Sequence, residues 1–141
     1  MANKNIFLTA LLFSSVSFGQ QKDYPIKEVY FTQVKLSDKF WLPRIETNRT
    51  VTIPASFERC ESTGRVKNFV MAAQKQGKFC TTYPFDDTDI YKTIEGASFS
   101  LAVHPDKKLE AYVDSLITII KSAQEPDGYL FTARTIDPIN V

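Results

Sequence analysis

The chain has 141 residues, of which 43% are hydrophobic and 23% charged, with a formal net charge of +1 at pH 7. This composition is typical of a globular domain and excludes an extensively disordered chain or a coiled coil. The near-neutral charge gives no reason to expect nucleic acid or an acidic membrane surface as a partner.

Residues 1–19 have the pattern of a secretory signal peptide. Lys4 gives a weakly basic start, an apolar run follows from Ile6 to Phe13, and small residues around Gly19 offer a cleavage point. The apolar run is too short to span a bilayer, and no later segment approaches the ~20 apolar residues that a span needs. We therefore expect a mature part at 20–141, no membrane span, and a periplasmic or secreted location.

Two cysteines, Cys60 and Cys80, lie in the mature part, and export would permit a disulfide between them. The alternative is two small buried thiols, which we favour. The only histidine, His104, stands beside a proline, and two cysteines at this separation match no zinc spacing. The sequence therefore predicts no metal site within this chain.

The mature chain is expected to begin with one or two short strands. Val29, Phe31, Val34 and Leu36 nearly alternate with polar residues, and the alternation breaks once near Gln33.

Two short helices should follow the strands. Thr52 is the expected N-cap of the first helix, with Pro54 in its first turn and Gly64 closing it in the left-handed conformation. The second helix is expected over residues 65–76, with Gly77 ending it.

A helical hairpin is the main predicted element. Apolar residues recur at helical spacing after Thr88 or Asp89, either of which could be the N-cap, and Pro105 ends this helix. Asp106 should cap a second helix, whose apolar stripe continues to Ala123.

The short connection makes these two helices antiparallel neighbours. The loop before the first helix and the loop after the second then lie at the same end of the hairpin, and both are rich in polar and aromatic residues. We therefore expect a shared ligand-binding face formed by Asp87, Asp89, Tyr91, Gln124, Asp127 and Tyr129.

The polar residues of this face have more than one explanation. Carboxylates at a helix N-terminus and a Pro-Asp-Gly turn need no ligand, because helix amides and turn geometry favour them. A calcium loop is a poor match, since its closing bidentate glutamate is missing. Carbohydrate binding also fits, because carboxylates and amides bind paired hydroxyls while aromatic rings such as Tyr91 and Tyr129 cover a sugar ring.

No catalytic residue is predicted within this chain. Asp87 and Asp127 could be paired as glycosidase carboxyl groups from position alone, but no pattern supports that role. The apolar stripes of the hairpin have too few partners to close a core, so we expect the front part of a larger helical protein.

Six motifs, in order, resemble the N-terminal part of the bacterial beta-L-arabinofuranosidase family, glycoside hydrolase family 127 and its close relative 146. They are FWLPR at 40–44, NRTVTIP at 48–54, TGRVKNF at 63–69, FDDTDIYK at 85–92, EGA at 95–97 and AQEPDGYL at 123–130. Together they cover most of the mature chain. The resemblance implies a mainly α fold at the start of an (α/α)6 toroid barrel of helical hairpins.

The resemblance also implies a function. The family removes beta-linked L-arabinofuranose from the non-reducing end of glycans by a retaining mechanism, with a zinc-bound cysteine as nucleophile and a glutamate as acid/base. Those residues and the zinc would lie beyond Val141, so Cys60 and Cys80 are not taken for the nucleophile. The Asp-Ser-Asp of the family corresponds to Asp87-Thr88-Asp89 in this sequence.

We therefore expect the N-terminal segment of an exported glycoside hydrolase acting on a plant-type glycan, inactive by itself, with zinc only in the longer protein. The alternative is a small secreted helical module that binds carbohydrate or a protein. A toroid polysaccharide lyase ranks last, because aspartates rather than cations dominate the two loops.

Overall fold

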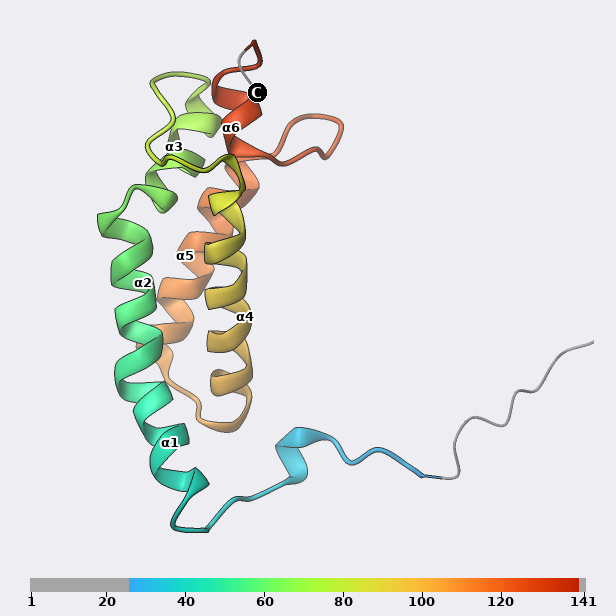
Figure 1. Ribbon diagram of the computed structural model, residues 1–141. Coiled ribbons are helices and arrows are strands. Elements are labelled where there is room, and N and C mark those ends of the chain that lie inside the picture. The colour runs from blue at the N-terminus through green and yellow to red at the C-terminus, as the bar shows by residue number, and fades with distance from the viewer. Residues whose placement is uncertain (1–25, 140–141) are drawn as a thin grey trace, which may run out of the picture.

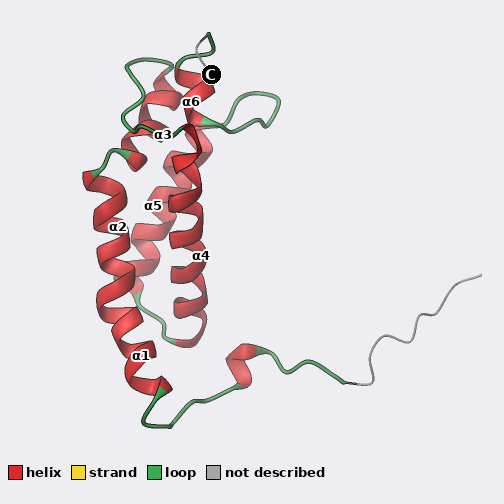
Figure 2. Cartoon of the chain, in the orientation of Figure 1, coloured by secondary structure: helices red, strands yellow, loops and turns green. Residues whose placement is uncertain are grey.

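The computed structural model describes residues 26–139 as a helical bundle (Figure 1), so the expected signal peptide at 1–19 lies outside the described residues. Helices make up the regular structure of this part, and it contains no strand (Figure 2). None of its helices combines the length and hydrophobicity that crossing a membrane would require.

The strands expected between Val29 and Leu36 are absent. This segment is extended except for a short 3-10 turn, η1, at Phe31–Gln33. A strand needs a neighbour to pair its backbone groups, and no other extended segment of the described chain pairs with it. Instead, the Phe31 ring packs edge-on against Phe99, with 5.2 Å between ring centroids.

The first long helix begins earlier than predicted. Helix α1 (Trp41–Thr47) continues through a π-helical turn, η2 (Asn48–Thr52), into α2 (Ile53–Ser62). The Asp38 carboxylate starts it by accepting hydrogen bonds from the backbone N–H groups of Phe40 and Trp41, at 2.8 and 2.6 Å. Thr52 is therefore inside the helix and makes no side-chain cap.

Proline explains the π turn. Pro54 has no N–H to donate, and its ring crowds the carbonyl four residues before it. The helix widens just before it, so that the N–H of Ile53 bonds to the carbonyl of Asn48, five residues back.

A sharp corner joins α2 to α3 (Arg65–Gln74). Gly64 has the predicted left-handed conformation, with φ of 85°. Helix α3 ends at Gln74, two residues earlier than expected, and is followed by Lys75 in the left-handed conformation, with φ of 48°. The loop that follows is held by the buried Asn68, whose side chain accepts from the Cys80 N–H at 2.7 Å and donates to Thr81 at 3.2 Å.

The predicted hairpin is confirmed. A 3-10 turn, η3 (Pro84–Asp86), leads directly into α4 (Asp87–Val103), so neither Thr88 nor Asp89 is the N-cap. Helix α5 (Lys107–Ala123) runs antiparallel to α4 (Figure 1) and is capped by Asp106, whose carboxylate accepts from the N–H groups of Lys108 and Leu109.

The core forms where α5 packs against α2, α3 and α4, while the short α6 (Thr132–Ile136) covers the end of the bundle beside α3. The buried residues of this core are Ile53, Phe57, Cys60, Val66, Phe69, Ala72, Ile90, Ala97, Val113, Leu116 and Ala123. Other apolar side chains of the hairpin remain exposed, among them Phe99 and Ile117. A complete toroid is not visible in the described residues and stays a prediction.

The corner at Gly64 yields a stability prediction. A Cβ there would lie 2.7 Å from the Cβ of Cys80, and the left-handed backbone disfavours any L side chain. Gly64→Ala should therefore lower the free energy of unfolding by about 1–3 kcal/mol.

Gly96 supplies the matched control, because it is helical and a Cβ there meets nothing within 4 Å. Gly96→Ala should raise stability by about 0.5–1 kcal/mol. Urea denaturation of both variants measures the difference, and equal effects would contradict this account of the corner.

Candidate functional site

The start of α4 and the end of α5 lie at the same end of the hairpin (Figure 1), as the spacing predicted. The segment that follows α5 is bonded back to the start of α4 through Asp87. Its carboxylate accepts from the backbone N–H and the side-chain hydroxyl of Thr132, at 2.8 and 2.6 Å. Thr132 follows the predicted rear loop and was missed from the sequence, because nothing local marks it as a partner.

Asp87 is 5% exposed, and both its oxygens are occupied. Burial raises the pKa of this carboxyl above its ordinary value, the two bonds from Thr132 lower it in part, and the nearby Asp86 adds to the rise. The side chain is thus a tie between α4 and α6, and its oxygens are not free to bind a ligand.

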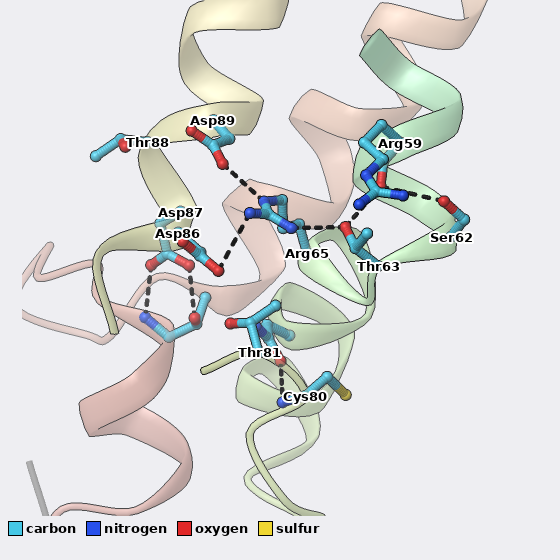
Figure 3. Close-up of polar contacts among 12 residues, drawn as sticks. Arg59, Ser62, Thr63, Arg65, Cys80, Thr81, Asp86, Asp87, Thr88 and Asp89 are labelled. Atoms are coloured by element: carbon cyan, nitrogen blue, oxygen red, sulfur yellow. Dashed lines mark hydrogen bonds and ion pairs between the residues drawn. The ribbon is translucent and has the colours of Figure 1, made fainter. Parts of the chain in front are cut away.

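Asp89 belongs to a second network, centred on Arg65 (Figure 3). The Arg65 guanidinium donates to Asp89 at 2.7 Å and to Thr63 at 2.7 Å, and lies 3.4 Å from Asp86. The hydrogen bond to Asp89 is the main cause that raises the pKa of Arg65. Since Arg65 begins α3 and the two acids begin α4, this network fixes the two helix ends against each other.

Arg65 was also missed as a site residue, although a signal existed. Three carboxylates crowded into four positions favour a nearby cation, and Arg65 stands in the same set of motifs.

Tyr91 lies on the first turns of α4, with its ring edge-on to Phe69 at 5.8 Å between centroids. Burial, with a contribution from the charge of Asp87, raises the pKa of Tyr91 to about 12. At neutral pH its hydroxyl therefore stays protonated and can donate a hydrogen bond.

The rear loop is built from its own polar residues. Gln124 donates to the Gly128 carbonyl at 2.8 Å, and Asp127 accepts from the Tyr129 N–H at 3.0 Å. The Arg134 guanidinium lies over the Tyr129 ring, 4.7 Å from its centroid. Gln124, Asp127 and Tyr129 are nonetheless exposed on a loop that projects from the bundle (Figure 1), so turn formation and ligand contact are both compatible with them.

The six predicted residues therefore separate into three groups. Asp87 is buried in a tie, Asp89 and Tyr91 lie along the first turns of α4, and the remaining three form the projecting loop. Asp89 also lines a groove between α2 and α4 with a volume of ≈ 620 Å³.

The cysteines do not suit a zinc site. Both are free thiols: Cys60 is buried, while Cys80 is exposed, with its sulfur 3.7 Å from that of Met71. The favoured interpretation of two buried thiols is thus right for Cys60 and wrong for Cys80. Within residues 26–139 no three side chains of His, Cys, Asp or Glu gather as metal ligands, and burial raises the pKa of Cys60, which opposes the thiolate form.

Comparison with known proteins identifies the family to which the chain is similar. A model described as the GH127 catalytic domain of beta-L-arabinofuranosidase matches residues 33–140. The chain belongs to this family. The resemblance drawn from the six motifs is thereby confirmed.

Relatives of the GH127 family agree with the match. A non-reducing end beta-L-arabinofuranosidase of Bifidobacterium longum subsp. longum is 48% identical over 52 residues, 37% of this chain and 8% of that protein. A solved GH127 beta-arabinofuranosidase has a TM-score of 0.73 and 55% identity over 77% of this chain. A GH127 beta-L-arabinofuranosidase from Geobacillus stearothermophilus T6 has a TM-score of 0.71 and 32% identity over 76% of this chain.

This GH127 chain spans only part of its relatives. It covers 17% and 18% of the two solved structures. The family match therefore concerns a small part of the length of these relatives.

The tie between Asp87 and Thr132 gives a second prediction. Asp87→Ala leaves a buried hydroxyl and N–H without acceptors, which should lower the free energy of unfolding by about 2–4 kcal/mol. A double-mutant cycle with Thr132→Val should show a coupling of about 1–3 kcal/mol. Additive effects would mean that the two side chains do not depend on each other.

The raised pKa of Asp87 gives a third prediction. Between the ordinary value of 3.8 and the higher folded value, the native state binds more protons than the unfolded state at this residue. The stability that Asp87 contributes should therefore fall as pH rises through this window, and level off above the folded pKa.

Denaturation of the wild type and Asp87→Asn from pH 3 to 7 isolates this contribution, because asparagine does not titrate. A wild-type advantage that instead grows with pH would show that the bonds from Thr132 outweigh burial.

Proposed function

We propose that this chain is the N-terminal segment of an exported glycoside hydrolase that releases beta-L-arabinofuranose, or a closely related sugar, from the non-reducing end of plant-type glycans. The observation that carries the proposal is the GH127 catalytic-domain match over residues 33–140. It is supported by a curated relative named for the same activity. Export rests on the signal-peptide pattern at 1–19.

The proposed mechanism is retaining, with a zinc-bound cysteine as nucleophile. The described residues do not suit these roles, since the Cys60 thiol is buried and no three metal-binding side chains gather among them. In this proposal the catalytic groups and the zinc belong to segments of the protein outside the present sequence. The present chain positions and borders the sugar site rather than performing the chemistry.

The side chains that could contact a sugar are accessible to solvent, and hydrogen bonds within the chain fix their positions. Asp89 is fixed by Arg65, and Asp127 and Tyr129 are presented by a loop with internal hydrogen bonds. Pre-fixed acceptors and an aromatic ring are what a sugar with neighbouring hydroxyls requires.

Exposed apolar side chains on the helices support the larger barrel. Phe99 and Ile117 lie on the hairpin, and Trp41 lies at the start of α1, and each is about half exposed. Apolar surface of this kind usually marks an interface. We propose that further hairpins of an (α/α)6 barrel cover it, which disfavours a self-contained binding module.

An activity assay tests the proposal. Protein from the complete reading frame and the 141-residue chain would each be given p-nitrophenyl beta-L-arabinofuranoside with zinc present. We expect hydrolysis by the longer protein alone. Activity from the short chain, or none from either, would overturn it.

Tyr129→Ala in the longer protein probes the projecting loop. Loss of the ring should raise KM by several-fold with little change in Tm, since packing of an exposed ring against a sugar contributes about 1 kcal/mol or more. Tyr30→Ala is the matched control, because Tyr30 is exposed and directly precedes η1, and this N-terminal segment (blue in Figure 1) lies away from the projecting loop. Equal KM values for the two variants would exclude Tyr129 from the site.

A further inference from the structure

The groove between α2 and α4 has a charge pattern that the proposed function does not use. Its volume of ≈ 620 Å³ falls within the range of small-ligand sites. One wall has Thr52 at the end of η2 with Ser56 and Arg59 of α2, and the opposite wall has Asp89 and Lys92 of α4. Both walls are helical, so the groove is a fixed feature of the bundle.

Cations outnumber carboxylates in this groove. Arg59, Arg65 and Lys92 line it, against Asp89 alone. The Arg65 guanidinium and the Asp89 carboxylate form an ion pair at 2.7 Å, so their charges neutralise each other. The Asp86 carboxylate is a second ion-pair partner of Arg65, at 3.4 Å. Figure 3 shows Arg65 between these acids and the end of α2.

The other two cations remain available. Lys92 is only loosely engaged: its ammonium donates a long hydrogen bond to the Thr88 hydroxyl at 3.4 Å and lies 3.9 Å from Asp89, and its side chain is 72% exposed. In the described part of the chain, no carboxylate lies within ion-pair distance of the Arg59 guanidinium. The groove therefore offers one planar, bidentate cation on α2 and one mobile cation on α4.

Polar groups beside Arg59 add a second kind of contact. Ser56 lies three residues before Arg59 and Thr52 four residues before Ser56, so all three share one face of the helix. Hydroxyl groups next to a guanidinium suit a ligand that carries both an anionic group and hydroxyls.

We propose that this groove binds an anionic sugar residue of the glycan, a uronate or a sulfated sugar, with Arg59 and Lys92 on its charged group. The ligand class rests on the proposed function, while the charge preference goes beyond it. Guanidinium groups bind planar carboxylates through two parallel hydrogen bonds, which favours a uronate.

Calorimetric titration of the protein from the complete reading frame tests the preference. The ligands are tri-galacturonate, its fully methyl-esterified form, and a sulfated galactose disaccharide. The esterified form keeps the same sugar chain but carries a neutral methyl ester in place of each carboxylate, so it should bind at least about tenfold more weakly than tri-galacturonate. Equal binding of the charged and esterified forms, or no binding of either, would overturn the proposal; stronger binding of the sulfated sugar would identify sulfate as the preferred group.

Substitutions locate the binding. Arg59→Gln should weaken binding of tri-galacturonate about tenfold, and Arg59→Lys should restore part of it. Lys67→Gln is the matched control, because Lys67 is an exposed residue of α3 outside the groove and its loss changes the net charge equally. Similar losses for Lys67→Gln and Arg59→Gln would place the anion elsewhere, and thermal melts of all variants confirm that they fold.

Hydrolysis of the neutral p-nitrophenyl beta-L-arabinofuranoside separates the two proposals. Hydrolysis without preference for charged ligands would leave the proposed function intact and end the inference about the groove. Binding of tri-galacturonate without hydrolysis of the arabinofuranoside would support the inference about the groove and overturn the proposed function.

Discussion

The buried pair of Asp87 and Thr132 holds the functional end of this bundle together. It joins positions 45 residues apart and closes α6 onto the first turn of α4. Because α6 follows directly from the projecting loop, the pair also fixes the place where that loop leaves the bundle. The Arg65 network then attaches α3 to the same turn of α4. Two sets of polar contacts thus set the positions of three helix ends.

These contacts give the three aspartates at the start of α4 different structural roles. From the sequence, Asp86, Asp87 and Asp89 were equivalent acids at a helix start, compatible with either capping or sugar binding. In the structure Asp87 and Asp86 are buried in structural contacts, while Asp89 stays partly open on the groove. Adjacent residues of the same type therefore differ in role, because the helix points each one toward a different neighbour.

Local patterns were predicted well, and long-range partners were not. The hairpin, its Asp106 cap and the left-handed Gly64 all follow from residues close in sequence, and all are confirmed. The strands near Phe31 and the helix start at Thr52 were wrong. A strand depends on a pairing partner elsewhere, and the cap at Asp38 overrode the proline signal.

The same reasoning applies to the site. Proximity of the two loops could be derived from antiparallel geometry, since a short turn leaves no other arrangement. Arg65 and Thr132 could not be identified in this way, because their partners are 24 and 45 residues away. The family match supplies what local spacing lacks, because it compares most of the chain at once with whole known proteins.

The π turn at Asn48–Thr52 sets the rotational phase of the long first helix. One additional residue in a helical turn rotates everything on one side of it by about 100° relative to the other. Deleting one residue there would restore regular winding and swing the Trp41 end around the helix axis while Ser56 and Arg59 stay facing α4. A one-residue length difference between homologues at this point would thus alter what the N-terminal end of the helix meets and leave the groove unchanged.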